Sequence, residues 1–239
     1  YLVHLCLVAG GDVGVYQLHE LPRTPKRDYL SLPADRASPG DPDIIPSIDR
    51  KVTPELIKAA LDRVQELATN ENTFWTDQFN NPDNRSGYHT MAEEILGVVD
   101  GPIDAFVMGV GTGGCFSGNA EILKHHHPDI RCLALEPATS PALSQSGPLG
   151  GHRLEGMGAG FIPSICRLDL ADEIVAVSDE DAYQTALQLA QREGIFGGIT
   201  SGANVWAALQ KARALGPGHR VVTVIVDSGL KYLRGDLFQ

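Results

Sequence analysis

The stretch "DAFVMGVGTGGCFSG", residues 104–118, decides the fold of this chain. An apolar run typical of a buried strand ends in a cluster of glycines, and a helix-like segment follows. Glycines let the backbone approach a ligand closely, and the N–H groups at the start of a helix point toward an anion. We therefore predict a phosphate-binding loop between a strand and a helix. A tight turn that binds no ligand is the alternative interpretation.

Strand-like and helix-like patterns alternate on both sides of this loop. The strands are uniformly apolar, as in "VVTVIV", which is typical of a parallel sheet buried on both faces. We therefore predict an α/β fold with helices on both faces of a mostly parallel sheet. The predicted strands are 73–76, 103–109, 131–135, 173–177 and 221–226, with a short one within 1–9. The predicted helices are 54–69, 87–97, 115–125, 179–193 and 201–214.

The composition excludes several classes of protein. The 239 residues carry 19 basic and 30 acidic side chains, a net charge of −11, which disfavours nonspecific binding to nucleic acid. No apolar run reaches the roughly 18 residues of a membrane span. The four cysteines have no paired spacing, so we expect neither a metal site nor a disulfide framework. Reduced thiols favour a cytoplasmic location, and the opening residues contain no basic leader.

The glycine loop also fits a second interpretation. Gly109, Gly111 and Gly114 match the pattern GxGxxG, and Glu136 follows Gly114 by 22 residues, at the end of the next predicted strand. That spacing is typical of a dinucleotide site, where the acidic residue binds a ribose hydroxyl. An NAD-binding dehydrogenase domain is therefore an alternative function.

Six ordered motifs carry a more specific resemblance. They are "DQFNNPDN" (77–84), "GVGTGGCFSG" (109–118), "LEPATSPAL" (135–143), "LEGMGAGFIP" (154–163), "GGITSGAN" (197–204) and "VDSGLKYL" (226–233). Together they resemble the cysteine synthase and cystathionine β-synthase family, which are fold-type-II enzymes dependent on pyridoxal 5′-phosphate (PLP). The resemblance covers roughly residues 45–239. It implies a three-layer fold like that of the tryptophan synthase β-subunit, PLP as cofactor and a homodimer.

The resemblance assigns expected roles residue by residue. Thr200 corresponds to the residue that bonds the pyridine nitrogen, and Asp227 lies near that nitrogen. Cys115 replaces the threonine that usually ends the phosphate loop, and a thiol is a weaker donor than a hydroxyl. The expected phosphate loop is Gly111, Thr112, Gly113, Gly114 and Cys115. The expected substrate-binding residues are Gln78 and Phe79 in the wall and Gly156, Met157 and Gly158 in the loop opposite the cofactor.

The resemblance also implies a lysine that is missing here. In the family, the Schiff-base lysine lies in an "SxKDR"-like stretch near the N-terminus, before an "SGNTG"-type loop. Lys26 is embedded in prolines and lacks that context, so the catalytic lysine is absent. We expect β-replacement at O-acetylserine or O-phosphoserine by a sulfur nucleophile to give cysteine, with this chain alone inactive. A lysine-less, non-catalytic partner subunit is the other alternative.

The resemblance divides the chain into three parts. Residues 1–44 match no part of the family, and with six prolines between positions 22 and 46 we predict extended loop or disorder over 20–44. We expect 45–98 to be the remnant of a smaller α/β domain and 99–239 to be the larger, cofactor-binding domain. The chain begins without Met, and its composition changes abruptly near residue 44. We therefore expect a fragment or a shifted reading frame.

Overall fold

The computed structural model describes residues 4–9, 12–17, 51–69 and 74–233, together with 45, 47, 49, 235, 237 and 238. For the first two of these segments the backbone alone is described. The prediction of extended loop or disorder over 20–44 lies outside the described residues.

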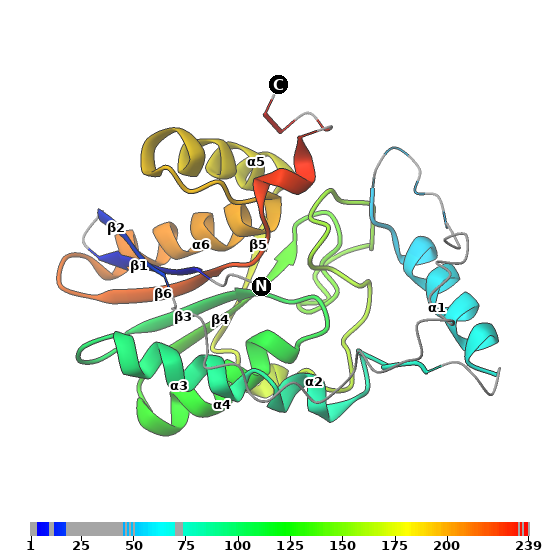
Figure 1. Cartoon of the computed structure of the whole chain (residues 1–239), viewed down its shortest axis with the longest axis horizontal. Helices are drawn as coiled ribbons and strands as arrows, with labels where there is room; N and C mark the ends of the chain where they lie inside the picture. Colours follow the sequence, from blue (N-terminus) through cyan, green and yellow to red (C-terminus); the bar gives the residue numbers. More distant parts are fainter. Residues whose placement is uncertain are drawn as a thin grey trace, which may run out of the picture.

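A six-stranded sheet forms the centre of the fold, in the order β2-β1-β6-β3-β4-β5 (Figure 1). Its four strands β6, β3, β4 and β5 run parallel, whereas β1 pairs antiparallel with β6 and β2 pairs antiparallel with β1. The prediction of a mostly parallel sheet is therefore confirmed, and β2 is an addition that we did not predict. The strands are β1 His4–Ala9, β2 Asp12–Gln17, β3 Ala105–Gly109, β4 Arg131–Pro137, β5 Glu173–Val177 and β6 Arg220–Ile225.

The helices confirm five predicted segments with small shifts at their ends. They are α1 Pro54–Ala68, α2 Pro82–Ser86, α3 His89–Val98, α4 Gly114–His126, α5 Asp179–Gln188 and α6 Ile199–Leu215. A π-helical turn, Leu189–Glu193, continues α5 to the predicted end of that helix. The predicted strand at 73–76 is wrong, because residues 74–76 have no regular structure. The short helix α2 was not predicted.

Side chains that cap two helices fix where those helices begin. Thr53 accepts a hydrogen bond from the backbone N–H of Leu56 at 3.2 Å, and Pro54 occupies the first turn of α1. Ser178 accepts from the N–H of Asp181 at 3.0 Å at the start of α5. Serine and threonine suit these positions, because their side-chain oxygens accept from N–H groups that have no partner inside the helix.

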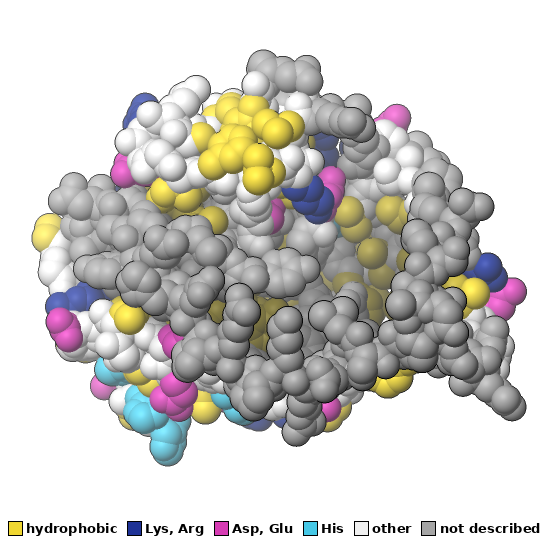
Figure 2. Space-filling model, viewed as in Figure 1, with side chains coloured by type: hydrophobic (Ala, Val, Ile, Leu, Met, Phe, Trp, Pro, Cys, Tyr) yellow, Lys and Arg dark blue, Asp and Glu magenta, His cyan; other side chains and the backbone are white. Residues whose placement is uncertain are grey.

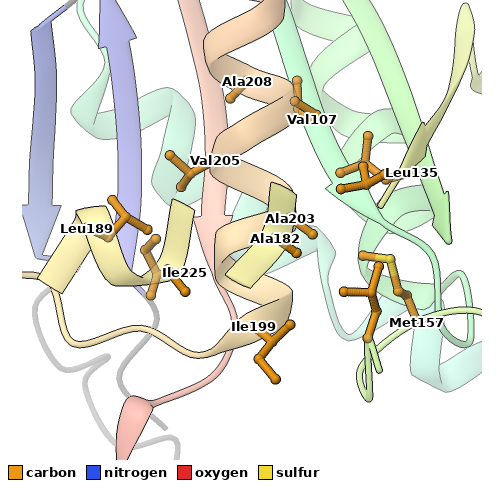
Figure 3. Packing of buried hydrophobic residues seen from close by; sticks show 14 of the residues in the cluster. Val107, Leu135, Met157, Ala182, Leu189, Ile199, Ala203, Val205, Ala208 and Ile225 are labelled. Atoms are coloured by element: carbon orange, nitrogen blue, oxygen red, sulfur yellow. The ribbon is translucent and has the colours of Figure 1, made fainter. Parts of the chain in front are cut away.

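Helices cover both faces of the sheet, as the prediction of three layers requires. Alternate residues of β3 point to opposite faces. Val107 packs in one buried cluster with residues of α5 and α6 (Figure 3). Phe106 and Met108 pack in a second cluster with residues of α3 and α4. The sheet therefore lies between an α5–α6 layer and an α3–α4 layer (Figure 1).

The predicted boundary between the two domains, at residue 98, lies at the end of α3, and α3 packs in the second cluster. Ile95 of α3 is fully buried in the same cluster as Phe106 and Phe116. By contrast, α1 contains no buried residue and lies to one side of the sheet (Figure 1). The division into 45–98 and 99–239 remains a prediction, with α3 in close contact with the larger part. No described helix is both long and apolar enough to cross a membrane.

Candidate functional site

A cavity of about 360 Å³ lies at the carboxyl ends of β3 and β6. Parallel α/β sheets place their ligands at this end of the strands. Figure 2 shows a hollow on this side of the molecule in which hydrophobic side chains are visible. The cavity is lined by Tyr88, Met91, Met108, Gly109, Gly111, Thr112, Gly113, Cys115, Gly156, Thr200, Val224, Val226, Asp227, Lys231 and Tyr232.

The glycine loop runs along one wall of this cavity, from the end of β3 to the start of α4. Gly113 has φ 84° and precedes the first residue of α4, a backbone conformation that glycine adopts without strain. A Cβ added at Gly111 would lie 2.6 Å from the carbonyl oxygen of Gly156, and one at Gly113 would lie 2.5 Å from the Cβ of Cys166. The loop therefore needs glycine for its own packing, and it also presents the first N–H groups of α4.

Asn84 connects the 77–84 motif to this loop. Its amide nitrogen donates to the carbonyl oxygen of Gln78 at 2.8 Å and to Oγ1 of Thr112 at 3.1 Å. The Thr112 oxygen also accepts from the N–H of Gly114 at 3.3 Å. We did not predict a site role for Asn84, although it lies within a motif of the resemblance.

Cys115 lines the cavity as a protonated thiol. Burial raises its pKa to about 12, so the S–H group keeps its proton at neutral pH and is a weak hydrogen-bond donor. The Asn119 amide donates to the carbonyl oxygen of Cys115 at 2.7 Å. Cys115 therefore keeps one donor in the loop, weaker than the hydroxyl of a threonine.

Thr200 lies in the first turn of α6 and is almost fully buried. Its Oγ1 accepts a hydrogen bond from the N–H of Gly156 at 3.2 Å. A hydroxyl that accepts one bond still has its own proton to donate. Thr200 therefore supplies a neutral donor, which suits an unprotonated aromatic ring nitrogen.

Asp227 caps α6 with its carboxylate and so holds Thr200 in position. One oxygen accepts from the N–H of Thr200 at 3.2 Å and from the hydroxyl of Tyr232 at 2.7 Å. The other accepts from the N–H and the hydroxyl of Ser201, at 2.9 and 2.5 Å. Burial, followed by the charge of Asp227, raises the pKa of Tyr232. The four bonds direct the carboxylate toward α6 and Tyr232.

The five expected substrate residues are divided between the cavity and its surroundings. Gly156 lines the cavity, whereas Met157 is buried in the core. Gly158 has φ 72°, and its N–H donates to the carbonyl oxygen of Val110 at 3.0 Å. Phe79 packs edge-on against Phe161, with ring centroids 5.1 Å apart. The exposed Gln78 is tied to the loop through Asn84.

Several lining residues were not predicted, because they come from segments outside the glycine loop. Tyr88 and Met91 reach the cavity from the start of α3. Lys231 pairs with Glu155 at 2.6 Å, and its side chain is 57% exposed. The "VDSGLKYL" motif could have directed attention to Lys231 and Tyr232, because it already contained Asp227.

Glu136 is not available to a ribose. It is almost fully buried and accepts from the N–H groups of Leu143 and Ser144, at 2.7 and 3.2 Å, and from the Ser144 hydroxyl at 2.5 Å. The residue that favoured the NAD interpretation is therefore used in holding the 143–144 turn. Across the described part of the chain, no group of three His, Cys, Asp or Glu side chains is placed to hold a metal ion.

Comparison with known proteins identifies the class. Residues 45–227 match the family described as "Pyridoxal-phosphate dependent enzyme", and the chain belongs to this family. A cysteine synthase of Staphylococcus aureus strain Mu50 is 42% identical over 186 residues, which are 77% of this chain and 60% of that protein. This chain therefore spans about 60% of the length of that curated relative.

Solved structures place the fold among the same enzymes. A hydrogen sulfide-producing enzyme from Fusobacterium nucleatum matches with a TM-score of 0.69 and 40% identity, over 74% of this chain and 60% of that one. The O-acetyl serine sulfhydrylase isoform 3 of Entamoeba histolytica matches with a TM-score of 0.71 and 34% identity, over 76% of this chain and 55% of that one. The predicted fold class and family resemblance are therefore confirmed.

Proposed function

We propose that the cavity binds PLP, with the phosphate at Gly111–Cys115 and the ring nitrogen at Thr200. The observation that carries this proposal is that the glycine loop and Thr200 line one cavity. The Thr200 hydroxyl accepts one hydrogen bond and still has a proton to donate. The glycine loop and the hydroxyl fit the two ends of the cofactor. The family to which the chain belongs uses the same cofactor.

The residues of the chain have distinct tasks in this proposal. The N–H groups in the first turn of α4 donate to the phosphate, and the helix dipole favours its negative charge. The hydroxyl of Thr112 and the thiol of Cys115 offer further donors. Because Thr200 is neutral, it leaves the ring nitrogen largely unprotonated. PLP, when bound, supplies the electron sink for carbanion chemistry, and an unprotonated ring favours β-replacement over transamination.

For the whole protein we propose β-replacement at an activated serine, O-acetylserine or O-phosphoserine, by a sulfur nucleophile to give cysteine. The printed functions of the relatives support this reaction, since they include a cysteine synthase and an O-acetyl serine sulfhydrylase. The six lysines of the chain include none in the context of the family's Schiff-base lysine. We therefore propose that this chain alone binds the cofactor without turning over substrate.

A cytoplasmic location and a homodimer complete the proposal. Three described cysteines are free thiols. A cytoplasmic location is consistent with them, because thiols are kept reduced in that compartment. The homodimer rests on the resemblance to the family. Fractionation of the producing cells and sedimentation of the purified chain test the two statements separately.

A chimera tests the proposed reaction. Residues 45–239 of this chain would follow the N-terminal part of the S. aureus cysteine synthase that the match does not cover. We expect the chimera, supplied with PLP, O-acetylserine and sulfide, to form cysteine, and the chain alone to bind PLP without forming it. A chimera that folds and binds PLP but forms no cysteine from O-acetylserine or O-phosphoserine would contradict the proposal.

A further inference from the structure

One hydroxyl in the cavity wall has no role in the site described so far. Tyr88 immediately precedes α3 and lines the same cavity as the glycine loop. Among the described residues its hydroxyl makes no hydrogen bond, whereas the hydroxyl of Tyr232, which lines the same cavity, is bonded to Asp227. A half-buried phenol beside an anion-binding loop is a donor without an acceptor.

The packing of Tyr88 on α4 places this side chain along the helix toward the loop. A Cβ added at Gly118 would lie 2.9 Å from the Cβ of Tyr88. The base of the Tyr88 side chain therefore packs on α4 at Gly118. Cys115 lies three residues earlier on α4, about one helical turn. A tyrosine side chain is long enough to cover one turn of about 5.4 Å. Since Tyr88 and Cys115 both line the cavity, the ring extends from Gly118 toward the start of the helix.

The electrostatics agree with this placement. Burial raises the pKa of Tyr88, and the nearby Cys115 raises it further. Because its pKa is raised, the phenol keeps its proton at neutral pH. A protonated hydroxyl donates to an anion, and a bond to a charged acceptor is stronger than one between neutral groups.

We propose that the Tyr88 hydroxyl donates a hydrogen bond to the phosphate group bound at Gly111–Cys115, as an additional phosphate-binding residue. This inference rests on the proposed binding of PLP. It also explains how the loop tolerates cysteine at its last position. Cys115 is a weak donor, and Tyr88 supplies a hydroxyl in the same cavity.

The substitution Tyr88→Phe tests the inference, because it removes the hydroxyl and keeps the ring against Gly118. The affinities of the full chain for PLP, for pyridoxal without its phosphate and for inorganic phosphate would be measured by calorimetric titration. We expect Tyr88→Phe to weaken PLP and inorganic phosphate about ten-fold, the effect of one bond to a charged group. The affinity for pyridoxal should stay unchanged.

Tyr232→Phe is the matched control, since Tyr232 lines the cavity at the Thr200 end. That variant should weaken pyridoxal and PLP by the same factor. A second variant, Cys115→Thr in the Tyr88→Phe background, should restore part of the lost affinity for phosphate by returning a hydroxyl to the loop. Circular dichroism would establish that each variant is folded.

The outcomes distinguish a failure of the Tyr88 inference from a failure of the proposed PLP binding. If Tyr88→Phe binds PLP as tightly as the parent chain, or loses pyridoxal and PLP equally, the inference is wrong and the PLP site stands. If the parent chain binds neither PLP nor inorganic phosphate, the proposed function and the inference both fail.

Discussion

The backbone N–H of Gly156 donates to Oγ1 of Thr200 at 3.2 Å, across 44 residues of sequence. The carbonyl oxygen of the same Gly156 lies 2.6 Å from where a Cβ on Gly111 would stand. The 154–158 loop thus contacts both the glycine loop and the start of α6. One residue without a side chain fixes the spacing between the proposed phosphate and ring-nitrogen sites.

Replacing the hydroxyl at position 200 tests this spacing. Thr200→Val removes the acceptor of Gly156 and the donor for the ring nitrogen, whereas Thr200→Ser keeps both. We expect the valine variant to lose about 1 kcal/mol of stability and about three- to ten-fold in affinity for PLP, the range for neutral hydrogen bonds. Urea unfolding and PLP titration measure the two effects. Equal affinity in the valine and serine variants would rule out a role for the hydroxyl in binding.

The cap that Asp227 forms on α6 predicts a large loss of stability. Asp227→Ala leaves the N–H groups of Thr200 and Ser201 and the hydroxyl of Tyr232 without their acceptor. We expect a decrease of about 2 kcal/mol in the free energy of unfolding. The control is Asp62→Ala, which breaks an exposed pair with Lys58 and should cost less than about 1 kcal/mol. Similar losses in the two variants would contradict the capping role.

A threonine at position 115 should strengthen phosphate binding. The Cys115 thiol keeps its proton because its pKa is raised to about 12, yet an S–H group donates more weakly than an O–H group. We expect Cys115→Thr to tighten PLP about two- to five-fold, a fraction of a full hydrogen bond, and to leave pyridoxal unchanged. Cys115→Val is the control of similar shape and should weaken PLP. If Cys115→Thr bound both PLP and pyridoxal more tightly, the gain would not come from the phosphate, and the prediction would be wrong.

Acid should destabilise the fold through His152. This side chain is almost fully buried, its Nε2 donates to the carbonyl oxygen of Gly158 at 3.0 Å, and burial lowers its pKa from 6.5. Because the unfolded chain takes up the proton first, stability is full above pH 6.5 and decreases as pH falls below it. The slope is at most about 1.4 kcal/mol per pH unit.

The variant His152→Gln should remove this slope between pH 7.5 and 5. The exposed His125 is the control, and His125→Gln should keep the slope of the parent chain. Urea unfolding at several pH values measures it. A parent chain whose stability is constant across this range would show that His152 does not titrate as expected.

Local patterns predicted most of the fold. Helix-like patterns marked five of the helices, and "VVTVIV" marked a buried parallel strand by composition alone. The segment "DVGVYQ" of β2 was missed because its glycine and aspartate weaken a strand pattern. The helix α2 was missed because its Asn- and Pro-rich residues are also typical of a turn.

The site was predictable only where its residues share a motif. The glycine loop is a local signal, and Thr200 and Asp227 came from the family resemblance. Tyr88 could not be found this way, because its place depends on how α3 packs against Gly118 of α4. Glu136 shows the opposite case: its spacing suggested a ribose ligand, and its carboxylate instead holds Leu143 and Ser144.

The most direct test of the account is calorimetric titration of the full chain with PLP and, separately, with NAD. We expect saturable binding of PLP, competition by inorganic phosphate and no binding of NAD. Binding of NAD without binding of PLP would show that the cavity is a dinucleotide site, and the central claim would be wrong.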